Sequence, residues 1–206
     1  MSLFTSRKRR QEPASAPRPT GALDRVHPVG ALPTAMAAGD AARMAMPLAH
    51  QYASNLRLFL VLSGPDLNAA GRAGEWQFHY VYPDEHCESI LTVYNEASSP
   101  YPGQAVVREQ VTPWPPPGSP QEAMLLFQGT TAKLIIEEQW ADRLERLPGL
   151  PEAFIDSTDA MAAVKSLGVD MALGGAGSKM KGRTPPGRHP VWEIVNGVAV
   201  YHTPFA

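Results

Sequence analysis

Hydrophobic and polar residues alternate along Glu75–Glu96, which reads EWQFHYVYPDEHCESILTVYNE. Every second position of the first arm is aromatic, from Trp76 to Tyr82. In the second arm, β-branched and aromatic residues take every second position between Ile90 and Tyr94. A polar cluster that opens with a proline separates the two arms. This period of two, split by such a cluster, predicts an antiparallel hairpin with one solvated face.

The chain on either side of this hairpin predicts a helix and two more strands. Alanine, methionine and leucine dominate from about Thr34 to Ser54, so we expect a helix there, which either kinks or restarts at Pro47. Leu56–Ser63 is almost continuously apolar, which is typical of a strand in the centre of a sheet. After the hairpin, Gln104–Val111 alternates again and predicts a fourth strand.

Further helices are predicted in the C-terminal part of the chain. Glu122–Phe127 and Ala132–Leu147 have helical patterns, although the adjacent isoleucines of the second could instead form a short strand. Asp156–Leu167 opens with acidic residues, which suit the positive end of a helix. We expect Ser157 to cap this helix and Gly168 to close it.

A flexible loop and a second hairpin are expected at the end of the chain. Gly174–Arg188 is rich in glycine, lysine, serine and proline, which predicts the loop. Strands at Val191–Val195 and Val198–Tyr201 follow. They are joined at Asn196-Gly197, the strongest short hairpin signal in the sequence.

One short pattern occurs twice, as GRAGEWQF from Gly71 and as GRHPVWEI from Gly187. Each copy follows an Ala/Met-rich helix and a loop, which suggests a repeated helix-then-sheet unit. We therefore predict an α+β fold of two related helix-on-antiparallel-sheet halves behind a disordered N-terminal tail. The expected parts are a basic, proline-rich tail at 1–34, a first half at 35–111, a proline-rich linker at 112–120 and a second half at 121–206.

This order of elements resembles the PepSY-like domain family over roughly residues 35–206. The residues that carry the resemblance are Trp76-Gln77-Phe78, Phe154-Ile155-Asp156-Ser157 with Ala160 and Ala163, and Pro190-Val191-Trp192-Glu193-Ile194. The family is associated with peptidase propeptides and cell-envelope proteins. The resemblance implies a small, non-catalytic α+β domain that binds or inhibits protein partners, and it implies no catalytic residues.

The composition permits a sizeable core and excludes some classes of partner. The 206 residues are 44% hydrophobic and 18% charged, and the net charge of -2 gives no general attraction to nucleic acid or anionic membranes. The single cysteine, Cys87, excludes an internal disulfide. The basic N-terminus lacks the apolar stretch of a secretory signal, and the longest apolar run, Leu58–Leu62, is too short to span a bilayer. We therefore expect a cytoplasmic protein.

Three patterns suggest chemistry but are better explained otherwise. The turn from Asp84 to Glu88 gathers metal-capable groups without the paired Cys or His spacing of a zinc site. Cys87 lies beside His86, yet no third group is placed to orient a thiol nucleophile. Gly174–Lys179 differs from a phosphate loop because serine precedes the lysine and prolines follow. We expect no catalytic residue, no metal and no cofactor.

Two groups of basic residues are candidate contacts for an acidic partner or a phosphate, with a merely solvated surface as the alternative. The first group is Lys179, Lys181, Arg183, Arg188 and His189, and the second, in the tail, is Arg7, Lys8, Arg9 and Arg10. Four further residues are expected in the core, with an aromatic binding platform as the alternative for Trp76 and Trp192. These expected core residues are Trp76, Phe78, Trp192 and Ile194.

These observations favour a non-enzymatic protein-binding or regulatory module that acts through a sheet edge or the basic 174–190 loop. One alternative is a small-molecule-binding protein or enzyme with a pocket between helix and sheet near His79. Another is a structural subunit of a larger assembly. A protein partner is expected under the first hypothesis, while the partner's identity and the oligomeric state stay open.

Overall fold

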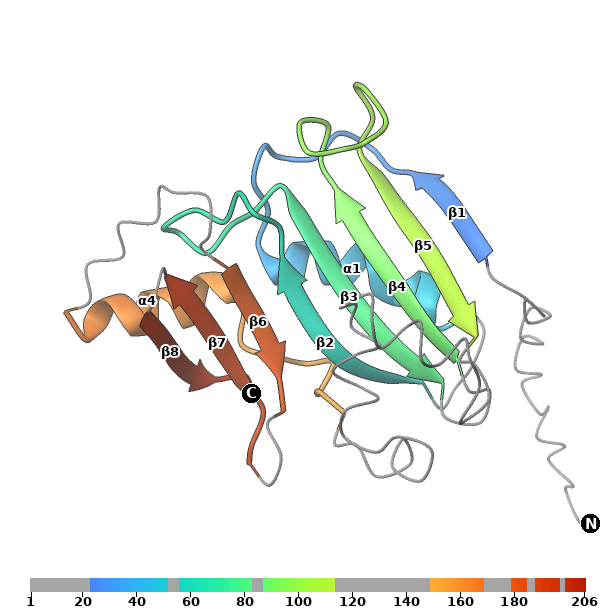
Figure 1. The fold of residues 1–206 in the computed structure, drawn as a ribbon. Helices are drawn as coiled ribbons and strands as arrows, with labels where there is room; N and C mark the ends of the chain where they lie inside the picture. Colours follow the sequence, from blue (N-terminus) through green and yellow to red (C-terminus); the bar gives the residue numbers. More distant parts are fainter. Residues whose placement is uncertain are drawn as a thin grey trace, which may run out of the picture.

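The structure, a computed structural model, describes residues 23–51, 56–82, 87–113, 149–168, 179–184, 188–196 and 199–206. Within these ranges, eight strands form one antiparallel sheet in the order β1-β5-β4-β3-β2-β6-β7-β8 (Figure 1). The strands are β1 (Leu23–Pro28), β2 (Arg57–Ser63), β3 (Glu75–Tyr82), β4 (Cys87–Tyr94), β5 (Val106–Pro113), β6 (Lys179–Arg183), β7 (Val191–Asn196) and β8 (Ala199–Pro204).

The predicted fold class, two related helix-on-sheet halves, is wrong. The described residues form a single continuous sheet with two short helices, α1 (Ala38–Ala49) and α4 (Ser157–Ser166). The two supposed halves merge where β6 pairs with β2, at Val61 with Gly182 and at Leu62 with Lys181. Because β2 lies between β3 and β6, strands from both parts of the sequence belong to one sheet.

Both helices lie behind the sheet in the view of Figure 1. Two hydrogen bonds tie α1 to β3. The indole Nε1 of Trp76 donates to the Met36 carbonyl at 2.9 Å, just before the helix, and the Tyr82 hydroxyl donates to the Ala49 carbonyl at 3.2 Å, at its end. The face of α1 that meets the sheet is made of small residues, which lets the helix approach closely: Ala38, Ala41, Ala42, Ala45 and Ala49. Pro47 lies in the last turn of this single helix, so no second helix starts there.

An aromatic cluster joins the centre of the sheet to its β8 end. Trp76 and Trp192 meet edge to face with ring centroids 6.2 Å apart, and Phe154 and Phe205 pack on Trp192 at 5.8 and 4.7 Å. The four expected core residues, Trp76, Phe78, Trp192 and Ile194, are fully buried. Packing therefore accounts for both tryptophans, and neither offers a stacking platform at the surface.

The residue expected to cap α4 instead caps α1. Asp156 is the N-cap residue of α4, whereas the Ser157 hydroxyl accepts the Ala38 amide at 2.9 Å and donates to the Gly71 carbonyl at 2.7 Å. The Asp156 carboxylate accepts the Gly39 amide at 3.2 Å. These side chains satisfy amides of the first turn of α1, which have no partner within the helix. The start of one helix thus holds the start of the other.

Other local predictions divide into three groups. The hairpin of β3 and β4 and the strands β2, β5, β7 and β8 confirm the strands predicted there, and Gly168, with φ of 77°, has the conformation expected of a glycine closing α4. The disorder predicted for all of residues 1–34 is wrong for Leu23–Pro28, which form β1. The flexible loop predicted at 174–188 is wrong for Lys179–Arg183, which form β6. Residues 1–22, 52–55, 83–86, 114–148, 169–178, 185–187 and 197–198 lie outside the described part, including the helices expected within 121–147.

Candidate functional site

We call the side of the sheet away from α1 and α4 the open face, because neither described helix lies over it. Several of its side chains are nevertheless buried, among them His79, Val81 and Thr92. The register defines a row of side chains that crosses this face from β1 to β8: Val26, Arg108, Thr92, Gln77, Leu62, Lys181, Glu193 and His202. Successive side chains of a strand point to opposite faces, so the neighbouring positions belong to the core side. The row is apolar only at Val26 and Leu62 and carries both signs of charge.

Three of the five basic residues proposed as partner contacts belong to β6 rather than to a loop. Lys179, Lys181 and Arg183 alternate with the buried Met180 and Gly182, so they share the open face. This alternation is the physical reason why KMKGR forms a strand. Lysine and arginine are tolerated because their side chains lie on the side away from the core.

Within this group, Arg183 is already paired inside the sheet. Its Nε donates to Glu193 Oε2 at 2.8 Å, and His202 Nε2 lies 3.6 Å from the same oxygen. Burial opposes ionisation of Glu193, but the Arg183 hydrogen bond and the charges of Arg183 and Lys181 together lower the pKa of its carboxyl below the usual value. Burial, followed by the charge of Arg183, lowers the pKa of Lys181. The charges of β6 and β7 thus largely serve each other.

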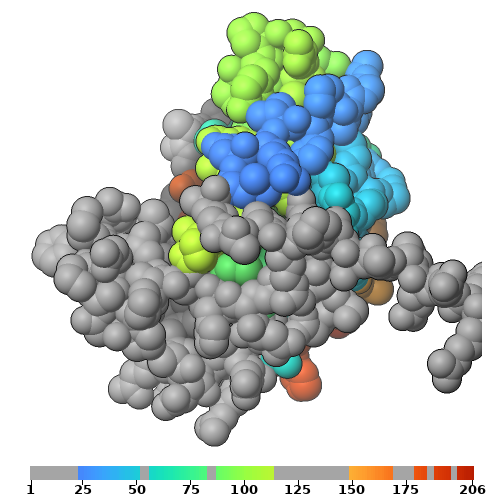
Figure 2. All heavy atoms as spheres, turned by 90° about the vertical axis from the view of Figure 1, so that its right-hand side faces the viewer, coloured from blue at the N-terminus to red at the C-terminus, as the bar shows by residue number. Residues whose placement is uncertain are grey.

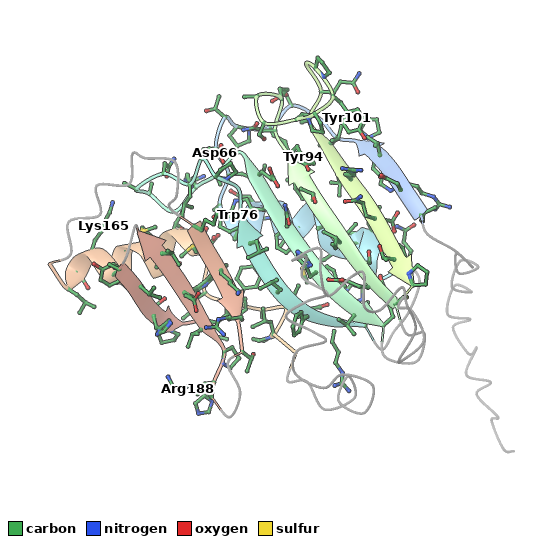
Figure 3. All side chains as sticks on the ribbon, viewed as in Figure 1. Asp66, Trp76, Tyr94, Tyr101, Lys165 and Arg188 are labelled. Atoms are coloured by element: carbon green, nitrogen blue, oxygen red, sulfur yellow. The ribbon has the colours of Figure 1, made fainter. Side chains whose placement is uncertain are left out.

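Arg188 and His189 complete the predicted basic group and are both exposed. They precede β7, and the labelled side chain of Arg188 lies below the strands in Figure 3. The basic residues therefore divide between strand β6 and the start of β7. The tail group, Arg7, Lys8, Arg9 and Arg10, lies outside the described residues.

His79 lies on the open face and forms a buried pair with Glu88. Its Nδ1 donates to Glu88 Oε1 at 2.8 Å, and the two side chains are only 2% and 7% exposed. Because Phe78 and Tyr80 face the core beneath α1, alternation directs His79 away from the helices. Neither described helix lies on the side of the sheet to which His79 points, and the pocket expected near His79 stays a prediction. His79 Nε2 is buried and has no hydrogen-bond partner among the described residues.

Strand β8 forms one edge of the sheet, and its backbone direction follows from one hydrogen bond. The Phe205 amide donates to the Pro190 carbonyl at 3.1 Å, toward β7. Hydrogen-bonding direction alternates along an antiparallel strand, so the amides of Val200 and His202 face away from β7. No described residue pairs with this outer side. The sequence of β8, AVYHTP, has no acidic residue, lysine or arginine, and Val200 is 51% exposed.

Helix α4 covers this edge and extends past it. It packs against β7 and β8, and its C-terminal end projects beyond β8 in Figure 1. Its buried stripe contains Ala160 and Val164, and the next position on that stripe is Leu167, the C-cap residue. Leu167 is nevertheless 75% exposed. The apolar face of α4 thus continues past the last described strand beneath it.

Strand β1, at the other edge, carries charged residues. In its sequence, LDRVHP, Asp24 and Arg25 are exposed and Pro28 has no amide to donate. Arg108 on β5 donates to both carboxylate oxygens of Asp24, which lowers the pKa of that carboxyl. The blue residues that begin with β1 lie at the surface in Figure 2, which views the molecule from this side. Charge and proline are common means by which sheet edges avoid pairing with other chains.

Sequence reasoning missed the difference between these two edges. It named a sheet edge as a recognition surface without identifying the strand. The helical spacing of Ala160, Val164 and Leu167 was the available signal, because it extends the apolar stripe to the last residue. Among the described residues no group of three His, Cys, Asp or Glu side chains could hold a metal ion, and neither helix has the length and apolar character needed to cross a membrane.

No protein-family model matches the chain, and no curated protein or solved structure has significant similarity to it. The resemblance to PepSY-like domains therefore stays a prediction.

Proposed function

We propose that the protein is a non-enzymatic protein-binding module that accepts an extended segment of a partner protein beside β8. The observation that carries the proposal is the apolar stripe of α4, which ends in the exposed Leu167 past an uncharged edge strand. Strand addition of this kind derives affinity from backbone hydrogen bonds and specificity from alternate side chains.

The backbone of β8 supplies the first requirement. The amides of Val200 and His202 and the carbonyls of the same residues face outward, so an added strand meets both donors and acceptors. The adjoining strand is firmly held, since Trp192 on β7 donates through Nε1 to the Ile155 carbonyl at 2.7 Å and packs on Phe205. A partner strand would therefore add to an edge with a rigid base.

The overhanging end of α4 supplies the second requirement. A ninth strand beside β8 would lie beneath this end, with alternate side chains pointing toward Leu167. Apolar residues at those positions would cover Leu167, whereas polar residues would lose water without a replacement partner. We therefore expect the bound segment to alternate apolar residues, toward α4, with polar residues on the open face.

Replacing Val200 with proline tests the proposal. Proline removes an outward amide without touching a bond to β7, so the fold should persist while strand addition fails. The partner is captured from the native host with the tagged full-length protein, and its amount is compared among variants. We expect Val200→Pro to reduce capture at least about tenfold.

The matched control is Val26→Pro, which removes an outward amide from β1. The Val29 amide donates to the Ala105 carbonyl at 3.0 Å, toward β5. Because the hydrogen-bonding direction alternates along the strand, the Val26 amide faces away from β5. This control should leave capture unchanged. Capture that survives Val200→Pro but fails in the double variant Arg188→Ser/His189→Ser would move recognition to the basic residues before β7 and overturn the β8 proposal.

A second candidate function is supported by the unpartnered His79 Nε2. A carboxylate that fixes one ring nitrogen leaves the other as a directed hydrogen-bond acceptor, and the cross-strand neighbours Leu60 and Ile90 are apolar. A small molecule bound there would need a hydroxyl or amide donor and an apolar body, and because Nε2 is buried its entry would require local opening of the surrounding residues. Ring ¹⁵N signals of His79 during an NMR screen of alcohols and amides provide the test, with His79→Phe as the negative control. Signals unchanged across the screen would reject this candidate.

A further inference from the structure

We infer that the strand added beside β8 is β8 of a second copy of this chain, running antiparallel and centred on Tyr201. This inference rests on the proposed function, because it names the occupant of the same edge. It makes the protein a two-fold symmetric dimer with one sheet continuous across both copies.

The backbone of β8 has the symmetry that self-pairing requires. Its outward amides belong to Val200 and His202, which lie at equal distances on either side of Tyr201. When two copies run antiparallel about Tyr201, each Val200 lies opposite the partner's His202. The amide and carbonyl of each residue then meet those of the other, which is the closely bonded pair of an antiparallel ladder.

The side chains of β8 also tolerate their own copies. Tyr201 would lie opposite the partner's Tyr201 on the side toward α4, where the residue is already half-buried against the core. An aromatic cross-strand pair stabilises a sheet, and the strand has no fixed charge to oppose its copy. Val200, 51% exposed in the single chain, would be covered beside the partner's His202.

Strand β1 fails the same comparison. Its outward amides, those of Asp24 and Val26, are symmetric about Arg25. Self-pairing would therefore place Arg25 directly opposite the partner's Arg25, and like charges in that position destabilise a sheet. Symmetry is available at both edges of the sheet, but only β8 has side chains compatible with it.

The overhang of α4 has a role in this arrangement. The two-fold axis runs through the sheet between the two β8 strands, so both α4 helices lie on the same side of the joined sheet. The end of each helix, with Leu167, then extends over the partner's β8. This contact covers the most exposed of the large hydrophobic residues in the described part of the chain.

Replacing Tyr201 with cysteine tests the dimer. Opposed residues at a pair without direct hydrogen bonds have Cα atoms about 4.5 Å apart, which a disulfide can bridge. We expect Tyr201→Cys to form a covalent dimer under mild oxidation. The unmodified chain should have, by light scattering, twice the 22.3 kDa mass of one chain. Arg25→Cys on β1 is the matched control, and it should form the same non-covalent dimer without a covalent cross-link. The native Cys87 is buried, so it should not cross-link.

Two further measurements separate this inference from the proposed function. Val200→Pro should weaken dimerisation at least about tenfold by sedimentation equilibrium, and Val200→Lys should do the same through charge repulsion if the proline variant fails to fold. A monomeric chain whose Tyr201→Cys variant stays uncross-linked overturns the dimer. If that monomer still loses its captured partner through Val200→Pro, the β8 edge binds a different protein and the proposed function stands. If capture is also unaffected, both fail.

Discussion

The two edges of the sheet differ in how they meet the surrounding solution. At β1, Asp24 is paired with Arg108 and Arg25 is exposed, while both edge strands end in a proline. At β8, no residue is an Asp, Glu, Lys or Arg, and Val200 is half-exposed. Edge strands carry unpaired backbone groups, and charge protects them from unwanted pairing. The edges therefore differ in fixed charge, and this difference is what the proposal of a partner strand at β8 depends on.

The helices differ in the same sense. Helix α1 lies over β3 and β4, which are interior strands, and its apolar face is fully used by the sheet. Helix α4 lies over β7 and β8, at the margin, and its stripe continues to the exposed Leu167. The alanine face of α1, over interior strands, is thus buried, whereas the apolar stripe of α4, at the end of the sheet, is buried only up to Val164.

The largest expected effect is a loss of stability at the β8 end of the sheet. A Cβ atom at Gly182 would lie 2.2 Å from the Phe205 ring, and the ring is held by Trp192 and Phe154. We expect Gly182→Ala to lower the free energy of unfolding by about 3 kcal/mol through overpacking. Hydrogen exchange should then show lost protection in β6–β8 before any loss in β1.

The matched glycine near β1 is Gly30, where an added Cβ meets nothing within 4 Å. Gly30→Ala should change the stability by less than about 1 kcal/mol, with a gain expected from reduced freedom of the unfolded chain. Equal losses of protection at both ends in Gly182→Ala would show that the two edges do not differ in local stability.

An intermediate effect is expected where the two helices join. Ser157→Ala removes the buried hydroxyl that accepts the Ala38 amide and donates to Gly71, leaving both backbone groups without that partner. We expect a loss of about 2 kcal/mol in unfolding free energy, measured by denaturant titration. Exchange protection of α1 should fall together with that of α4.

Ser166→Ala is the control for this change, because its hydroxyl donates to the Ala163 carbonyl at an exposed position. Its effect should stay below about 0.5 kcal/mol. If Ser157→Ala lowered the exchange protection of α4 but not of α1, the shared capping would be contradicted. The part of the sheet under α1 and the part under α4 would then be stabilised independently of each other.

The smallest expected effect is a difference in acid sensitivity. Glu193 and Asp24 both have lowered pKa values in the folded protein, so each stabilises the fold at neutral pH. That contribution is lost as the pH falls below the usual values of 4.5 and 3.8 and through the folded pKa values. Glu193 is 15% exposed and Asp24 49%, so water and salt screen Asp24 more.

Thermal unfolding between pH 7 and pH 3 measures this difference. Glu193→Gln should flatten the acid limb of the melting-temperature curve more than Asp24→Asn, and added salt should reduce only the Asp24 contribution clearly. Identical acid limbs for the two variants would show that the pairs at β7 and at β1 are equally exposed to solvent screening.

The sequence was sufficient where local alternation determines the element. The period of two in β3 and β4 and the closing Gly168 predicted the observed structure, because these signals depend on neighbours within a few residues. Strand β6 was missed since KMKGR is short and poor in β-branched residues. It forms a strand because β2 and β7 lie on either side of it and Phe205 fills the space beside Gly182.

The candidate site was harder to predict because it depends on which strand ends the sheet. A sheet edge was expected, but strand order is set by pairings between distant residues, such as Leu62 with Lys181. Helical spacing shows that Leu167 continues the stripe of α4, yet it cannot show that the sheet stops first. The basic residues of β6 were assigned to a loop for the same reason, although Arg183 is committed to Glu193.

The shared start of α1 and α4 has a consequence for synthesis of the chain on the ribosome. The Ala38 amide donates to the hydroxyl of Ser157, which lies 119 residues later in the sequence. The Gly39 amide donates to the carboxylate of Asp156, 117 residues later. Strands β1 to β5 can emerge and pair before that point, whereas the first turn of α1 stays uncapped. The nascent chain therefore holds an unfinished helix over a finished set of strands until Asp156 and Ser157 leave the exit tunnel.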